Sequence, residues 1–399
     1  MEASGRGSRL GLVLVATLAT LFIGFAHRSS CLIGGDFDER AYRTYCYSDL
    51  VPLYRSEGLD EGRVPYLEAR NEYPVLTGLF MWVASLGARS EGSFLFANAL
   101  GLMALGLATA WILYRLVGER ALFFSLAPSL ALYAFLNWDL LPVVLATGGI
   151  AAFLWRRDDV AGVLLGLGAA AKAYPALVAI PLCLDRLRNG DRRGAARIAG
   201  YGLGAWLVVN LPFAVASFGN WSYFFHFSSS RPPTPGTLWY HACRALTREV
   251  DCGSVGAVNA LSALAFVGGA FLLWSFSQRR RYQGPVWRLA LPLLVVFLLT
   301  NKVYSPQYSL WLLPLFALVL PDVRLFALFA IADLAVFLAE FSWLAGLQGL
   351  DGLPAWALAI AVAVRAAALA VLAASVSRRP AGRQPVHQAR TNTSPSSSS

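Results

Sequence analysis

The stretch "ALPLLVVFLLTNKVYSPQYSLWLLPLFALVL" spans Ala290 to Leu320 and holds two apolar runs on either side of a short polar connection. Apolar runs recur along nearly the whole 399-residue chain, and a run of about 20 such residues crosses a bilayer as a helix. In lipid the backbone has no water to bond, so each spanning run must be helical. The sequence therefore predicts an all-α, polytopic integral membrane protein.

The composition excludes an ordinary soluble domain. Hydrophobic residues make up 57% of the chain and charged residues only 14%, whereas roughly 25% charged residues is usual. The net charge of +10 does not indicate a nucleic-acid partner, because the arginines gather in short loops such as "DRLRNGDRRGAAR" (185–197) and "SQRRRYQ" (277–283). That distribution is the positive-inside pattern of a protein embedded in a lipid bilayer.

We count about 12 crossings, which form a single domain over residues 1–377. A Pro-, Ser- and Arg-rich tail follows at 378–399, and its composition predicts a disordered cytoplasmic segment. The apolar segments lie at 10–26, 75–88, 94–117, 121–136, 140–155, 160–184, 197–217, 255–275, 286–300, 308–320, 325–344 and 354–376.

The arginines also predict an orientation in the cell membrane. We expect the first apolar run to be retained as a helix, since no convincing signal-peptide cleavage site follows it. With the amino end inside, two long loops at about 27–73 and 218–254 lie outside. One conflict arises, because "WRRDD" (155–159) would then also lie outside. A re-entrant or broken helix near Pro175 and Pro181 would remove it.

The five cysteines divide between the loops and the apolar runs. Cys31 and Cys46 fall in the first outer loop, Cys243 and Cys252 in the second, and Cys183 in an apolar stretch. Close pairs outside the cytoplasm are typical of disulfides. The alternative is four free thiols.

The first outer loop is rich in acids, most of which are expected to be solvated. Asp49 differs because it lies in "YSDLVPLY" among apolar and aromatic neighbours, where partial desolvation makes a carboxylate a better base. Glu72, at the mouth of the second apolar segment, and Asp36 and Asp38 are candidates for acceptor binding or for a secondary acid.

Candidate cations lie near the predicted membrane surface. Lys172 and Lys302 are the only lysines in the sequence, and each lies inside or beside an apolar run. Together with His226 and Arg231 they could bind a lipid phosphate. The alternatives are an aromatic belt at the interface and lysines that snorkel to it. Three further acids are costly in apolar segments, namely Asp139, Asp333 and Glu340.

Several phrases, in order, resemble the actinobacterial polyprenol-phosphate-mannose-dependent mannosyltransferases of glycosyltransferase family 87. They are "DLVPLY", "GRVPY", "EYPVLTG", "GLGAAAKAYPAL", "TLWY" and "NKVYSPQYSLWLLP". The resemblance covers about 10–372 and departs from the family in having "NWD" at 137–139 where a "GQ" pair is common. It implies the multi-spanning type C glycosyltransferase fold.

The resemblance also implies a sugar donor carried on polyprenyl phosphate and a glycan or glycolipid acceptor, both reached from the extracytoplasmic side. An aspartate of the first outer loop acts as the base in that family, and Asp49 is its match by motif position. We expect inverting transfer of mannose, with Lys302, Arg231, His226 and Lys172 at the donor phosphate. The scheme requires no metal and no cofactor.

Two other classes of protein remain possible from the sequence. A secondary transporter or lipid-linked sugar flippase would also have many helices and intramembrane charges, but it would more often show an inverted repeat and short loops. A non-catalytic scaffold of envelope assembly is the other possibility.

Overall fold

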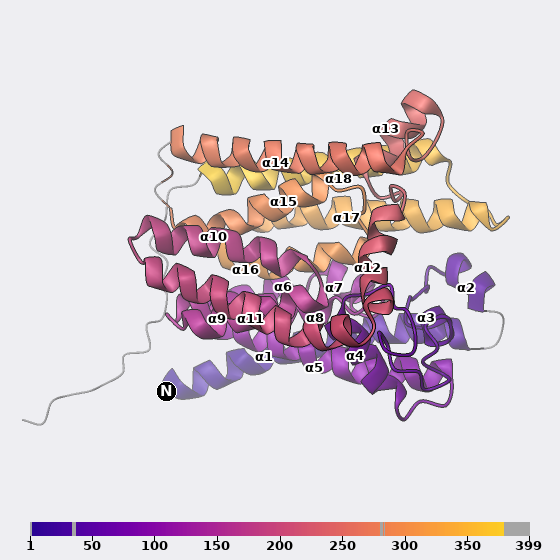
Figure 1. The fold of residues 1–399 in the computed structure, drawn as a ribbon, viewed down its shortest axis with the longest axis horizontal. Coiled ribbons are helices and arrows are strands. Elements are labelled where there is room, and N and C mark those ends of the chain that lie inside the picture. The colour runs from indigo at the N-terminus through magenta and orange to yellow at the C-terminus, as the bar shows by residue number, and fades with distance from the viewer. Residues whose placement is uncertain (1, 34–36, 280–281, 283, 379–399) are drawn as a thin grey trace, which may run out of the picture.

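The structure is a computed structural model that describes residues 2–33, 37–279, 282 and 284–378. Within these ranges the chain forms helices and no β-strand, which confirms the predicted all-α class. The long helices lie side by side along one long axis, and α12 (Phe218–Ser230) runs across it at one end (Figure 1). The predicted tail lies outside the described residues, apart from Arg378 at the end of the last helix.

The first half of the chain contains eleven α-helices and two short 3-10 helices. In chain order they are α1 (Glu2–Ser29), η1 (Ser30–Leu32), α2 (Phe37–Arg43), α3 (Pro52–Ser56), α4 (Val75–Ser85), α5 (Glu91–Val117), η2 (Gly118–Ala121), α6 (Leu122–Ser125), α7 (Pro128–Tyr133), α8 (Leu140–Leu154), α9 (Asp158–Ala171), α10 (Tyr174–Arg188) and α11 (Arg192–Ala216).

The second half begins with two helices at one end of the bundle and then returns to long apolar helices. In chain order they are α12 (Phe218–Ser230), α13 (Leu238–Thr247), α14 (Val255–Arg279), η3 (Val286–Leu289), α15 (Ala290–Thr300), η4 (Pro306–Trp311), α16 (Leu313–Val319), α17 (Val323–Leu347) and α18 (Ala355–Arg378).

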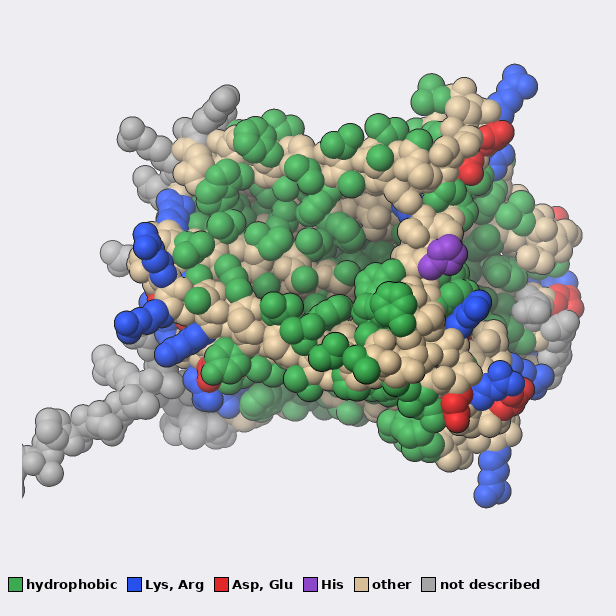
Figure 2. Space-filling view, in the orientation of Figure 1, with side chains coloured by type: hydrophobic (Ala, Val, Ile, Leu, Met, Phe, Trp, Pro, Cys, Tyr) green, Lys and Arg blue, Asp and Glu red, His purple; other side chains and the backbone are tan. Residues whose placement is uncertain are grey.

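The two ends of the bundle differ in charge and in what they carry. One end holds α2, α3 and α13 and is called the outer-loop end, and the other holds the 186–197 turn and is called the arginine-rich end (Figure 1). Figure 2 shows hydrophobic side chains covering the face between them. Within the described residues, six helices are long and apolar enough to cross a membrane: α1, α5, α11, α14, α17 and α18.

The predicted crossing at 75–88 is wrong. α4 has only 11 residues, and the chain after it is still at the outer-loop end. There the Tyr54 hydroxyl donates to the Ala88 carbonyl at 3.2 Å, and Arg55 pairs with Glu91 at 2.9 Å. A helix of 11 residues is only about 16 Å long, so α4 dips into the bundle without crossing it.

The segment 160–184 is two helices rather than one. α9 ends where Lys172 adopts an extended backbone, with φ −161° and ψ 143°, and α10 returns toward the arginine-rich end. There Arg186 donates to the Phe153 carbonyl at 2.7 Å and pairs with Asp158 at 2.7 Å. "WRRDD" therefore lies at the arginine-rich end, and the conflict in the predicted orientation disappears. The structure thus lacks the predicted crossing at 75–88 and has two crossings where one was predicted at 160–184.

This hairpin can be tested by cysteine labelling. In a Cys183→Ala background, we expect Arg157→Cys and Arg193→Cys to react with a membrane-impermeant maleimide from the same side of the membrane. Glu61→Cys, in the first outer loop, should react from the opposite side. Labelling of Arg157→Cys together with Glu61→Cys in intact cells would contradict the hairpin.

Glycines allow α9 and α11 to approach closely. A Cβ atom on Gly166 would lie 2.1 Å from the Gly202 carbonyl oxygen, and one on Gly162 would lie 2.6 Å from that of Ile198. Small residues spaced four apart are a common means of close helix contact in lipid. The contact fixes the hairpin beside α11.

Gly166→Ala should lower the thermal unfolding temperature in detergent, because overpacking costs roughly 1–3 kcal/mol and outweighs the gain of about 1 kcal/mol in helix propensity. Gly200→Ala on α11 is the matched control, since no other atom lies within 4 Å of its added Cβ. Equal unfolding temperatures for both variants would contradict the close contact.

Candidate functional site: a carboxylate beside two cations and an apolar cavity

Asp49 is positioned by a loop that docks on the chain just before α8. The Ser48 hydroxyl donates to the Phe135 carbonyl at 2.6 Å, and the Asp49 amide donates to the Leu136 carbonyl at 2.9 Å. Arg28, only 1% exposed, donates to the carbonyls of Tyr45 and Tyr47. Backbone bonds from both sides thus fix the place of this carboxylate.

The side chain of Asp49 is half-buried and accepts hydrogen bonds from neutral donors. The Asn137 amide nitrogen donates to Asp49 Oδ2 at 2.8 Å and to the Tyr73 hydroxyl at 2.6 Å, and the Tyr47 hydroxyl also donates to Asp49. The charge on Asp49 and burial raise the pKa of the Tyr47 phenol, which therefore stays protonated as a donor.

The electrostatic surroundings suit a base. Burial raises the pKa of Asp49 above its usual value, while the hydrogen bonds from Asn137 and Tyr47 and the charges of Arg231 and Lys172 act in the opposite direction. A carboxylate with a raised pKa binds a proton more tightly than a solvated one. Asp49 can therefore accept a proton and keep a defined orientation.

Lys172 lies at the break between α9 and α10 and contacts a buried acid. Its ammonium is 3.2 Å from Asp139 Oδ2, and the Trp311 indole donates to Asp139 Oδ1 at 2.6 Å. The ammonium also lies 5.4 Å from the ring centroid of Tyr73 and 5.1 Å from that of Tyr308. The ion pair joins α8, the hairpin and η4 at one point.

Arg231 follows α12 and is the second cation near Asp49. It interacts electrostatically with both Asp49 and Glu72, and no carboxylate lies within ion-pair distance of it in the described part of the chain. Its predicted contact with the donor phosphate stays a prediction. Burial, then the charge on Asp49, raises the pKa of Glu72.

Lys302 has surroundings that the sequence did not indicate. It is 6% exposed, and its ammonium donates to the backbone carbonyls of Ser229 at 3.0 Å and Arg231 at 2.5 Å. Burial, then the charge of Arg231, lowers the pKa of Lys302. Lys302 therefore holds the backbone that carries Arg231. Its direct contact with a phosphate stays a prediction.

The remaining predicted residues are not brought into this cluster by described contacts. His226 is exposed on α12. Asp36 lies outside the described residues, and Asp38 lies in α2 with a side chain that is also outside them. Their predicted roles stay predictions.

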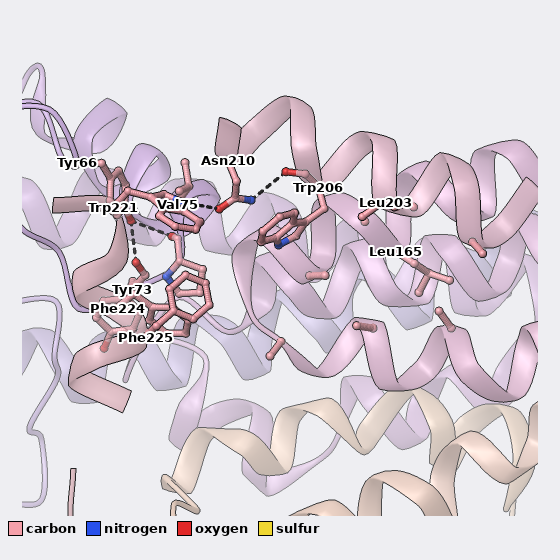
Figure 3. A pocket seen from close by; sticks show the side chains of 18 of the residues that line it. Tyr66, Tyr73, Val75, Leu165, Leu203, Trp206, Asn210, Trp221, Phe224 and Phe225 are labelled. Carbon is pink, nitrogen blue, oxygen red and sulfur yellow. Dashed lines mark hydrogen bonds between the residues drawn. The ribbon is translucent and has the colours of Figure 1, made fainter. Parts of the chain in front are cut away.

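An apolar cavity of about 400 Å³ adjoins the polar cluster. Figure 3 shows Tyr66, Tyr73 and Val75 near the aromatic side chains of α12, with Trp206, Leu203 and Leu165 continuing along the helices. Tyr73 belongs to both regions, since its ring lines the cavity and its hydroxyl is bonded to Asn137. The apolar cavity and the polar cluster that holds Asp49 therefore meet at Tyr73.

The comparison with protein families identifies the chain. Residues 72–301, more than half of the sequence, match glycosyltransferase family 87. The chain belongs to glycosyltransferase family 87. The match begins at Glu72 and includes Asn137, Lys172 and Arg231. Asp49 lies outside it, so its assignment depends on the sequence motif and on the geometry described above.

Solved structures with a similar arrangement are two forms of ArnT from Cupriavidus metallidurans. The form bound to undecaprenyl phosphate has a TM-score of 0.47 and 16% identity, and the match covers 92% of this chain and 76% of that one. The apo form has a TM-score of 0.45 and 17% identity over the same shares.

Sequence reasoning did not assign three residues that complete the site. Asn137 was noted only within the "NWD" departure from the family, Asp139 only as a costly acid in an apolar segment, and Tyr73, which precedes α4, only within a family phrase. The signal was available, because an Asn and an Asp before an apolar helix are costly in lipid unless they have partners. Their partners are far away in sequence.

Both disulfides considered above are present at the outer-loop end, joining Cys31 to Cys46 and Cys243 to Cys252. The first closes the loop directly before Asp49. A closed loop has fewer unfolded conformations, so it helps to hold the Asp49 segment against the bundle.

Glu57 predicts a pH effect on stability. Burial, then the charge of Glu72, raises the pKa of Glu57 from 4.5 to about 7. The folded state therefore holds a proton that the unfolded state has lost in this window, and stability falls as the pH rises through it. We expect Glu57→Gln to flatten the decline of the unfolding temperature between about pH 4.5 and 7. Exposed Glu61→Gln is the control, and an unchanged slope in Glu57→Gln would refute the prediction.

Proposed function

We propose that the protein is a membrane glycosyltransferase that moves a sugar from a polyprenyl-phosphate donor to a hydroxyl of a glycan or glycolipid. The observation that carries the proposal is the half-buried Asp49 carboxylate, held beside Arg231 and Lys172 and next to an apolar cavity. A lipid phosphate ester has the two matching parts, an anionic head and an apolar chain. The ArnT form bound to undecaprenyl phosphate binds a lipid of this class.

The proposed reaction is an inverting displacement. Asp49 takes the proton of the acceptor hydroxyl while its oxygen forms a bond to the anomeric carbon. The bond from that carbon to the phosphate oxygen breaks, and its electron pair leaves with the phosphate. The proton on Asp49 is then lost to solvent. General-base help of this kind contributes about 10²- to 10⁴-fold in rate.

The cations have different parts in this proposal. Arg231, without a carboxylate partner among the described residues, contacts the leaving phosphate and stabilises its growing charge. Lys172 adds its charge from beside Asp139. Lys302 acts mainly through the position of Arg231.

The motifs that resemble mannosyltransferases of the family support mannose as the sugar. The extracytoplasmic side is favoured because both disulfides and the site lie at the end opposite the arginine-rich turn. Arginine-rich loops are usually cytoplasmic, whereas disulfides persist in oxidising compartments. The acceptor is defined only as a hydroxyl of a glycan or glycolipid.

The test is sugar transfer by purified protein from radiolabelled polyprenyl-phosphate mannose, with other polyprenyl-phosphate sugars compared. Asp49→Asn should lose about 10²- to 10⁴-fold in kcat while unfolding at or above the temperature of the parent protein. Asp60→Asn, an exposed acid of the same loop, is the matched control.

Full activity in Asp49→Asn would refute the assignment of the base and move it to Glu72, Asp36 or Asp38. No transfer from any donor by the folded parent protein would instead favour a transporter or flippase of lipid-linked sugars. The two outcomes are distinguishable because the first requires an active parent protein.

A further inference from the structure

A buried charge cluster lies away from Asp49, between α17 and α18. Arg365 is 1% exposed and Asp333 is 0% exposed, and Arg365 Nη1 lies 3.4 Å from Asp333 Oδ1. A buried ion pair is expensive in the membrane. The proposed reaction gives this pair no role.

The pair binds η4 and the connection that precedes it. The Ser309 hydroxyl donates to Asp333 Oδ1 at 2.6 Å, and the Arg365 guanidinium lies 3.7 Å from the ring centroid of Tyr304. Ser129 of α7 donates to the other carboxylate oxygen at 2.7 Å. The segment 302–309 is thus fixed to the bundle by one arginine and one aspartate.

The same arginine binds the connection that carries Arg231. Arg365 Nη2 donates to the Gly236 carbonyl at 2.8 Å. Gly236 packs so closely that an added Cβ would lie 2.7 Å from the Tyr304 carbonyl oxygen and 3.4 Å from Arg365 Nη2. Only a residue without a side chain fits between the two segments.

The two connections are also bonded to each other. The Thr234 amide donates to the Lys302 carbonyl at 2.9 Å, and the Tyr304 amide donates to the Thr234 hydroxyl at 3.0 Å. Lys302 then donates to the Arg231 carbonyl. A continuous series of contacts therefore runs from Arg365 to Arg231.

We propose that the Arg365–Asp333 pair is a positioning element that holds the segments 229–237 and 302–309 together and thereby sets the place of the Arg231 guanidinium. The inference rests on the proposed function in giving Arg231 the donor phosphate. Arg365 touches no substrate, and its effect on the reaction passes through Arg231. Coupling through such packed networks is worth about 3- to 30-fold in affinity.

The kinetic test is a double-mutant cycle between Arg365 and Arg231. Arg365→Gln should raise KM for the polyprenyl-phosphate sugar about 3- to 30-fold with a smaller change in kcat. In an Arg231→Gln background the same substitution should have little further effect, because the group that it positions is already gone. Equal losses in both backgrounds would overturn the proposal.

A matched control separates positioning from loss of a buried charge. Arg186 is 4% exposed and pairs with Asp158 at the arginine-rich end, so Arg186→Gln removes a similar ion pair far from the site. It should leave KM for the donor unchanged. A rise equal to that of Arg365→Gln would assign the effect to general destabilisation and reject positioning.

Two further measurements keep the proposal testable. If Arg365→Gln does not fold, Gly236→Ala takes its place in the double-mutant cycle with Arg231→Gln. It should raise KM in the same way, since its Cβ would separate the two segments. Hydrogen exchange at the Thr234 and Thr237 amides, which are hydrogen-bonded in the structure, should accelerate in either variant and not in Arg186→Gln. This measurement needs no activity. Unchanged exchange would reject the positioning role, whereas an inactive parent protein with faster exchange would reject only the proposed function.

Discussion

The Asp139–Lys172 ion pair is the interaction on which the arrangement of the site depends. It occupies the point where α9 stops and α10 begins, and an ammonium in apolar surroundings needs a nearby carboxylate. Trp311 bonds to the same carboxylate, so three parts of the chain that are distant in sequence meet there. Removing either charge would leave the other buried without compensation.

The pair also explains why a polar site can exist inside an apolar bundle. A chain break exposes backbone groups, and these must find partners in lipid. The Thr77 hydroxyl donates to the Ala171 carbonyl at 2.8 Å, and Lys172 itself turns toward Asp139. The break therefore creates a satisfied polar surface, against which the Asp49 loop and Tyr73 pack.

The candidate base and its cations are held by rigid elements although they belong to loops. Asp49 is fixed through backbone bonds to the segment before α8, and Arg231 through Lys302. Loops often carry reactive groups on a stable scaffold. Here the scaffold includes buried charges, namely the Asp139–Lys172 pair and Lys302. Moving one of these charges would therefore also move the groups of the site.

The sequence by itself determined the helical membrane class, because hydropathy is a local property. Costly charges are local too, and from them the sequence predicted the outer loops, Asp49 as the base and the two lysines as cations of the site. It misjudged the crossings at 75–88 and 160–184, since a short apolar run can dip, cross or turn back with the same composition. Only the tertiary structure decided that Asn137 and Asp139 join the site and that Lys302 contacts backbone carbonyls. The backbone carbonyls that Lys302 contacts are at least 71 residues away in the sequence, and the side-chain partners of Asn137 and Asp139 are at least 33 residues away. No local pattern encodes such distant contacts.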